Sequence, residues 1–166
     1  MPSRRTVLTA VGSGVALPLT GCLDTEQRVQ GYVQLKAING VQEEPDKREE
    51  VPVLDVRASH DNDAGPELIY LEDEWANRIP IPRKPVVSEE LHDAFSDQFD
   101  SVRYVVGITS PGWADEDESL GSYNVATTRE NFNRVQVHTK VTASSDGTYL
   151  TIHSIDGIWD FNSTGQ

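Results

Sequence analysis

The sequence predicts a mainly β fold, an antiparallel β-sandwich or barrel of about six to seven strands with one short α-helix at residues 88–99. Three observations support this fold class: apolar and polar residues alternate in several runs, turn-forming clusters separate the runs, and only one segment has helical spacing of its apolar residues. The 166 residues are enough for one ordinary domain. We expect a single β-rich domain at residues 28–161 and a short tail at residues 162–166.

The first two predicted strands cover residues 28–37 and 51–58. In the first strand the odd-numbered positions form one face, and Lys36 belongs to the opposite face of polar or bulky residues. Such a period of two is typical of a half-buried strand. The acid-rich residues 42–50 between the strands are expected to form a solvated loop, which makes the pair a hairpin with a long connection.

The middle of the chain combines strand candidates with connections. Residues 67–71 form a short strand candidate, whereas alternate prolines make residues 79–85 an extended connector, because proline cannot donate to a sheet ladder. Residues 102–108 are nearly all apolar, which predicts a strand buried on both faces. The acidic stretch within residues 113–119 belongs to an exposed loop, and residues 122–127 form a weaker strand candidate.

Ser88 begins the one convincing helix. Its hydroxyl suits the N-cap position, and Glu89 and Glu90 suit the positive end of the helix dipole. The apolar residues of the segment fall at i, i+3, i+4 and i+8, so one face of the helix should lie on the sheet. These residues are Leu91, Ala94, Phe95 and Phe99.

A hairpin of strands 134–143 and 149–155 ends the predicted domain. The Asp-Gly pair at 146–147 is a strong signal for a two-residue type I′ turn. In that register Val141 lies opposite Ile152, so the apolar faces of the two strands coincide.

Two histidines of this hairpin are candidates for a metal site. In the predicted register His138 and His153 are diagonal neighbours, with Cα atoms about 7–8 Å apart, within reach of a shared zinc or copper ion. The alternative is that both are polar residues on the outer face of the sheet, since the strand pattern brings no third ligand near them.

Residues 61–72 resemble part of a calcium-binding loop. Asp61 and Asp63 begin it, and Glu72 stands at the twelfth position, where such loops carry a bidentate acid. Gly65 comes one place early, however, and the strand candidate that follows conflicts with a helix-loop-helix site. Calcium binding is one interpretation, and an acidic turn without a bound ion is the other.

The other candidate residues form no sequence motif. Residues 22–166 contain no metalloprotease, nucleophile-elbow or phosphate-loop pattern. A Ser/His/acid site is recognised by geometry, so a hydrolase that uses His60, His138 or His153 remains possible in principle. Trp113 and Trp159 stand near predicted strand ends and could line a ligand patch, with packing in the core or at its rim as the alternative.

The N-terminal residues have the order of a signal peptide. Arg4 and Arg5 precede an acid-free, mostly apolar stretch at residues 7–19. As a helix this stretch would cover about 20 Å, against the about 30 Å of a membrane's hydrocarbon core. Residues 1–21 are therefore expected to direct export rather than to span a membrane.

Residues 19–22 read Leu-Thr-Gly-Cys, which resembles the lipobox of lipoproteins, and Cys22 is the only cysteine. The Arg-Arg pair resembles the twin-arginine export motif. Together with an Asp-rich, Lys-poor remainder, these motifs make the chain similar to exported lipoproteins of halophilic archaea. The resemblance implies a diacylated Cys22, a lipidated linker at residues 22–27 and attachment to the outer face of the cell membrane. Such a protein could carry a glycan on Asn162, which begins an Asn-Ser-Thr sequon.

The charge excludes several partners. The chain has 27 acidic and 14 basic residues, a net charge of -13, and removing residues 1–21 takes it to -15 because they hold two arginines and no acid. Nucleic acids and anionic bilayers need clustered basic residues, so neither is an expected partner through such a patch. Two functions remain: a non-catalytic module that binds a protein, polymer or small molecule outside the cell, or a small extracellular hydrolase or metal-site enzyme that uses His138 and His153.

Overall fold

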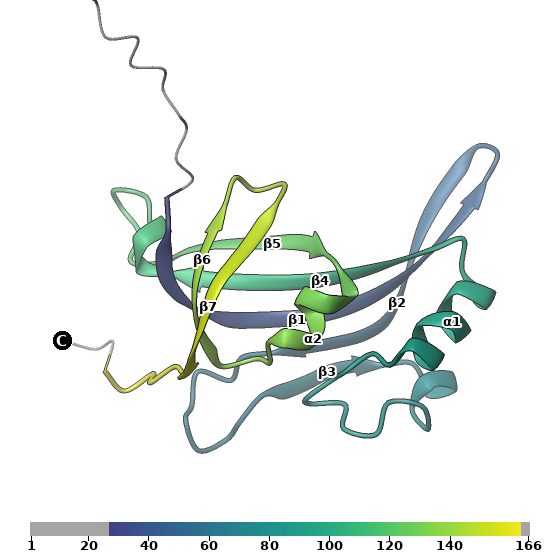
Figure 1. Ribbon diagram of the computed structural model, residues 1–166, viewed down its shortest axis with the longest axis horizontal. Coiled ribbons are helices and arrows are strands. Elements are labelled where there is room, and N and C mark those ends of the chain that lie inside the picture. The colour runs from purple at the N-terminus through teal and green to yellow at the C-terminus, as the bar shows by residue number, and fades with distance from the viewer. Residues whose placement is uncertain (1–26, 164–166) are drawn as a thin grey trace, which may run out of the picture.

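The sheet is built around its longest strand, β1 (Val29–Glu44). The structure is a computed structural model and describes residues 27–163. One edge of β1 pairs with β4 (Ser101–Ser110), and the other edge pairs first with β6 (Thr139–Ser145) and then with β2 (Lys47–Arg57) (Figure 1). Outer strands flank β2, β4 and β6, and they are β3 (Glu67–Leu71), β5 (Gly121–Thr127) and β7 (Leu150–Ile158).

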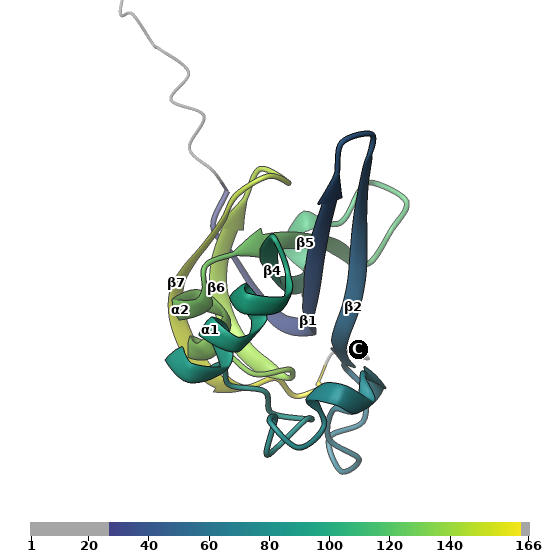
Figure 2. The same ribbon diagram turned by 90° about the vertical axis from the view of Figure 1, so that its right-hand side faces the viewer.

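The predicted mainly β, antiparallel fold of up to seven strands is confirmed, and the sheet is not closed into a barrel. On one edge of β1, β6 pairs with residues 29–32 and β2 pairs with residues 35–44. The two strands therefore diverge from each other between these stretches. Figure 2 shows the resulting two arms, β6–β7 on one side and β1–β2 on the other. The predicted loop at residues 42–50 is wrong, since all of these residues except Pro45 and Asp46, which form the turn, extend the strands of the β1–β2 hairpin.

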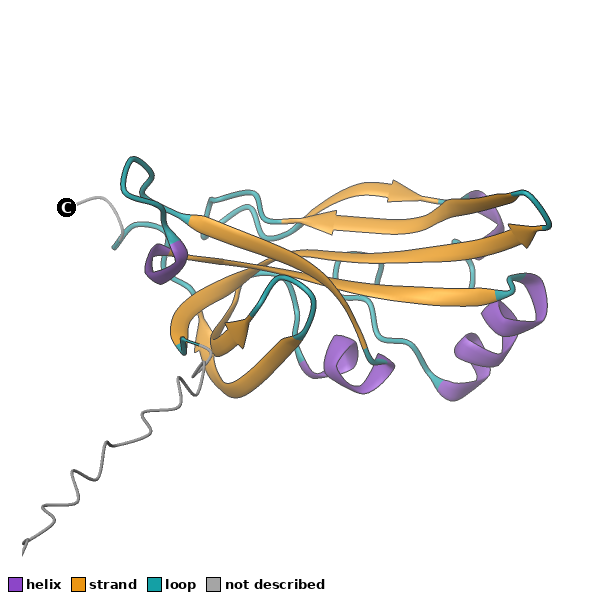
Figure 3. Ribbon diagram, turned by 90° about the horizontal axis from the view of Figure 1, so that it is seen from above, coloured by secondary structure: helices purple, strands orange, loops and turns teal. Residues whose placement is uncertain are grey.

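The helices α1 (Glu89–Gln98) and α2 (Arg129–Arg134) lie on the same side of the long strands (Figure 3). The predicted helix is confirmed: Ser88 Oγ caps α1 by accepting a hydrogen bond from Leu91 N at 3.1 Å. Phe95 and Phe99 of this segment are buried in the core. Single turns of 3₁₀ helix, η1 (Asp73–Trp75) and η2 (Pro111–Trp113), complete the described elements.

The C-terminal hairpin differs from the prediction. Residues 129–134 form α2, capped by Thr128, so the strand predicted from residue 134 begins only at Thr139. Ser145 pairs with Leu150, which leaves a four-residue connection in place of the two-residue turn. The longer connection, together with a register shift between Thr142 and Ala143, places Val141 opposite Ile155 rather than Ile152.

The predicted export and lipidation residues Arg4, Arg5 and Cys22 lie outside the described residues. Between residues 27 and 163, no helix is long and apolar enough to cross a membrane.

Lys36 is fully buried, which corrects its predicted place on the polar face of the first strand. The register of β1 against β4 shifts between Val33 and Leu35, and this bulge reverses the alternation of faces further along the strand. Lys36 Nζ donates to the backbone oxygens of Pro85 at 2.7 Å and Val135 at 2.8 Å, so it ties two distant connections to the centre of the sheet.

Candidate functional site

The candidate site lies where β2 and β6 part from β1. At this point Val33 O accepts a hydrogen bond from His138 N at 2.9 Å, and the next residue, Gln34, accepts one from Ala58 N at 2.8 Å. Ser59 N donates to His138 Nε2 at 3.3 Å, which joins the two diverging chains. The histidines His60 and His138 therefore stand on either side of the division in the sheet.

Both histidines have left-handed backbone conformations. His60 has φ of 60° and His138 has φ of 74°, and they are the only non-glycine residues with positive φ between residues 27 and 163. This conformation costs a residue with a Cβ about 1–2 kcal/mol. Backbone strain of this kind is concentrated at binding and catalytic sites, so its occurrence at two neighbouring histidines marks this part of the molecule.

The Phe161 ring contacts the rings of Tyr32 and of both histidines. Its ring centroid lies 4.9 Å from those of Tyr32 and His138 and 5.6 Å from that of His60, and the interplanar angles are 69–80°. Trp159 also packs on Tyr32, with ring centroids 5.3 Å apart and an interplanar angle of 37°. The edge-to-face contacts of Phe161 are favourable for aromatic rings, so the rings hold one another in place.

Hydrogen bonds fix the C-terminal segment that carries Trp159 and Phe161. Trp159 N donates to His138 O at 2.8 Å, and Phe161 N donates to Asn62 Oδ1 at 3.1 Å. The amide nitrogen of the same Asn62 donates to Asp160 Oδ1 at 2.8 Å. Asn62 thus clamps residues 159–161 against the loop that follows β2.

Next to this ring cluster lies a hollow of about 490 Å³, here called the aromatic pocket. Its volume is within the range of about 300–1,000 Å³ that is usual for ligand sites. Two other hollows, of about 570 and 590 Å³, are lined mostly by charged and polar side chains. The aromatic pocket differs in being lined by four segments distant in sequence, namely Tyr32, His60, Pro111, Ser119, Leu120, Trp159, Phe161 and Ser163.

Two titratable side chains of the site, His138 and Tyr32, favour their uncharged forms. Burial lowers the pKa of His138, and the nearby His60 lowers it further. Burial raises the pKa of Tyr32, which favours its protonated hydroxyl. Trp159 Nε1 is buried and has no hydrogen-bond partner among the described residues. The pocket therefore adjoins a cluster of rings with one unsatisfied donor.

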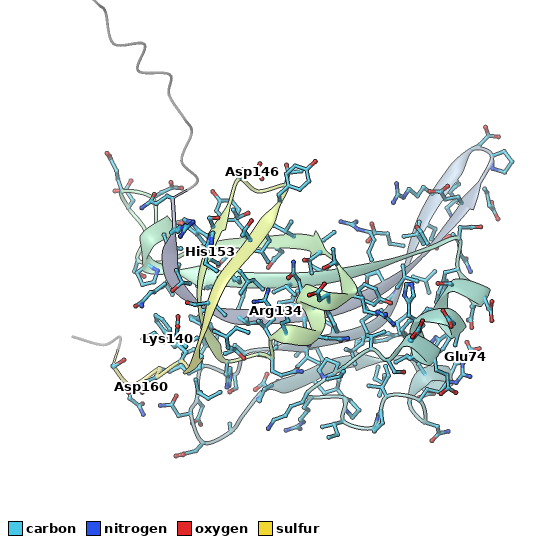
Figure 4. The ribbon with its side chains drawn as sticks, viewed as in Figure 1. Glu74, Arg134, Lys140, Asp146, His153 and Asp160 are labelled. Atoms are coloured by element: carbon cyan, nitrogen blue, oxygen red, sulfur yellow. The ribbon has the colours of Figure 1, made fainter. Side chains whose placement is uncertain are left out.

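The structure does not bring His138 and His153 together. His138 pairs with Trp159, and His153 stands six residues earlier on β7, which corresponds to about 20 Å along a strand. His153 Nε2 instead lies 2.9 Å from Ser144 Oγ. Figure 4 shows His153 well up the β6–β7 arm, away from Asp160 at its lower end. The prediction of a zinc or copper pair assumed a two-residue turn at residues 146–147, and the observed four-residue connection gives a different register.

The predicted calcium ligands are also separated. Asp61 Oδ1 accepts a hydrogen bond from Asp63 N at 2.9 Å, so these two residues form a local turn. Glu72 lies beyond the far end of β3, where its N–H bonds to Val53 O, and its carboxylate contacts Tyr70. Between residues 27 and 163, no three His, Cys, Asp or Glu side chains gather into a group that could hold a metal ion.

The remaining candidates lie at or near the same end of the molecule. Of the two candidate tryptophans, Trp159 lines the aromatic pocket, while Trp113 packs on Tyr123 with ring centroids 5.0 Å apart. Asn162 is exposed beside the pocket residues Phe161 and Ser163. Of the hydrogen bonds within the described chain, none joins a histidine to a carboxylate.

Comparisons with protein families, with curated proteins and with solved structures find no match to this chain. The site therefore has to be interpreted from its own geometry.

The strain at His60 gives a testable prediction. Because glycine adopts positive φ without the steric cost, His60→Gly should be more stable than His60→Ala by about 1 kcal/mol. Chemical denaturation of the two variants measures the difference. Asp61, whose φ is not positive, is the control: there the alanine variant should be the more stable one. Equal stability of the two His60 variants would contradict the assigned backbone strain.

Proposed function

We propose that this chain is a lipid-anchored extracellular binding module, non-catalytic, whose ligand site is the aromatic pocket. The observation that carries the proposal is the coincidence at one place of two strained histidines, a cluster of aromatic rings and a hollow of ligand size. The alternative of a small extracellular hydrolase or metal-site enzyme has no comparable support, because His138 and His153 are far apart and neither contacts a carboxylate.

The sequence supports the anchor. The lipobox-like residues end at Cys22, and β1 begins at Val29, so an extended connection between them would reach at most about 25 Å. Tyr32 of the pocket follows three residues later, and the start of β1 and the end of the chain lie at the same end of the molecule (Figure 1). A lipid on Cys22 would therefore hold the pocket close to the membrane surface.

Replacement of Cys22 tests the anchor. Cys22→Ser should release the protein into the medium, because the serine hydroxyl cannot take the thioether-linked lipid and nothing else in the expected mature chain is apolar enough to insert. Cell fractionation and immunoblotting measure the distribution. Thr25→Ser, a serine substitution three residues further on, is the matched control and should stay in the membrane fraction. Retention of Cys22→Ser in that fraction would refute lipid anchoring.

A further inference from the structure

The lining of the aromatic pocket holds no carboxylate, lysine or arginine, although the protein is strongly acidic. None of its eight lining residues is Asp, Glu, Lys or Arg, although the chain carries 27 acids and 14 bases. A charged group that entered the pocket would lose its hydration without gaining a carboxylate, ammonium or guanidinium partner, which is costly. The lining therefore favours a neutral ligand.

The carboxylates near the pocket do not change this preference. Asp160 stands between two lining residues, but its Oδ1 accepts hydrogen bonds from Asn62 Nδ2 at 2.8 Å and from Asn162 N at 2.9 Å. The acids at residues 115–118 precede Ser119 in the same loop and are exposed to solvent. They would repel an approaching anion, and none of them lines the pocket to pair with a bound cation.

The ligand must also be amphipathic. Rings of Tyr32, Trp159 and Phe161 form an apolar wall, whereas Ser119, Ser163 and His60 supply hydrogen-bonding groups. Within the described chain His60 makes ring contacts but no hydrogen bond, so its imidazole is available to a ligand. A purely apolar ligand would leave these polar groups unbonded, at a cost in free energy.

A sugar ring has the required chemistry. Its C–H bonds, gathered on one face, pack against the negative face of an aromatic ring, and its hydroxyl groups exchange hydrogen bonds with serine and imidazole. We propose that the aromatic pocket binds a neutral carbohydrate. This inference rests on the proposed binding function and specifies its ligand class.

The test compares oligosaccharides that differ in charge, by isothermal titration calorimetry on the full chain in molar salt. Maltotriose, mannotriose and N,N′,N″-triacetylchitotriose are the neutral probes. The same chitotriose backbone without its acetyl groups carries ammonium groups and is the cationic probe. Trigalacturonate is the anionic probe. A proline-rich decapeptide represents the other ligand class that aromatic grooves recognise. We expect at least one neutral trisaccharide to bind at least tenfold more tightly than every charged probe and the peptide.

Variants at exposed positions locate the binding. His60→Gly and Leu120→Ala change the pocket wall at side chains that are not buried, and each should weaken binding of the neutral sugar at least tenfold. Tyr149→Ala removes an aromatic ring that is 71% exposed outside the pocket and should bind as the unmodified chain does.

The outcomes separate the two proposals. Tighter binding of a charged probe or of the peptide, weakened by the two pocket variants, would overturn the inference of a neutral carbohydrate and leave the pocket as a binding site. Failure of all neutral sugars to bind would overturn the inference alone. Binding of a neutral sugar that neither pocket variant weakens would overturn the assignment to this pocket.

Discussion

Lys36→Ala is expected to lower the free energy of unfolding by at least about 3 kcal/mol, one of the two largest effects predicted for this protein. Besides its bonds to Pro85 O and Val135 O, Lys36 Nζ donates to Gln136 Oε1 at 3.2 Å and lies 3.9 Å from the centroid of the Phe132 ring. Alanine would take the lysine donor away from Val135 O, would leave Pro85 O with only the 3.2 Å bond from Gln136 Nε2, and would open a cavity at the centre of the sheet.

Lys36→Met is the matched control, because it keeps most of the volume and removes only the amine. It should lose less stability than Lys36→Ala. Urea denaturation measures all three proteins. A loss below about 1 kcal/mol in Lys36→Ala would contradict the role assigned to this lysine as the tie between the sheet and its connections.

The same residue makes stability depend on pH. Burial lowers the pKa of Lys36 to about 7 from the ordinary value of 10.5, so between these pH values the unfolded chain binds more protons than the folded chain. Stability should therefore rise with pH across this window, by about 2 kcal/mol between pH 7 and 9. Tyr104, whose pKa burial raises to about 12, acts in the opposite direction only above pH 10. In Lys36→Met the rise should disappear.

Salt is expected to have the second large effect. The described residues form four ion pairs, all exposed or partly exposed, which leaves most carboxylates of a chain with a net charge of -13 without a cation. Self-repulsion among them opposes folding, and ions screen it. The thermal midpoint should rise by roughly 10 °C or more between low and molar salt.

Calorimetry at matched pH checks this prediction, with potassium chloride and sucrose at equal osmolality as the pair of additives. Sucrose carries no charge and should raise the midpoint less than the salt does. A midpoint that is the same in low and molar salt would contradict the claim that repulsion among the carboxylates opposes folding.

Local patterns predicted the elements that depend on neighbouring residues. Ser88 and the apolar spacing after it located α1, and the apolar run at residues 102–108 located β4, which is buried between β1 and β5. The face of Lys36 could not be predicted, because a bulge in the pairing with β4 reverses the alternation. Likewise, α2 was missed because alternation from residue 134 outweighed the capping signal of Thr128.

The candidate site depends on contacts that no local pattern contains. Tyr32, His60, Leu120 and Phe161 belong to four separate segments and meet only because β2 and β6 part from β1. Trp159, near a predicted strand end, was the residue for which the sequence suggested a ligand patch and which lines the aromatic pocket. The two-residue turn, by contrast, paired His138 with the wrong part of β7 and so suggested a metal site that the register does not form.

Nuclear magnetic resonance tests whether the aromatic pocket is where this protein binds its ligand, without knowledge of that ligand. Isopropanol is a suitable probe because it is small, neutral and amphipathic, as the lining requires. The indole N–H signals of Trp159 and Trp75 report on the pocket and on the core, where Trp75 is only 2% exposed. Trp113 is no reference, because its turn η2 begins at the lining residue Pro111.

Titration of the ¹⁵N-labelled full chain with isopropanol should move the Trp159 indole signal in a saturable way, with little change at Trp75. His60→Gly should weaken that response, and Tyr149→Ala should not. A Trp159 signal that moves no more than that of Trp75, or that moves linearly without saturation, would show that the pocket is not a binding site.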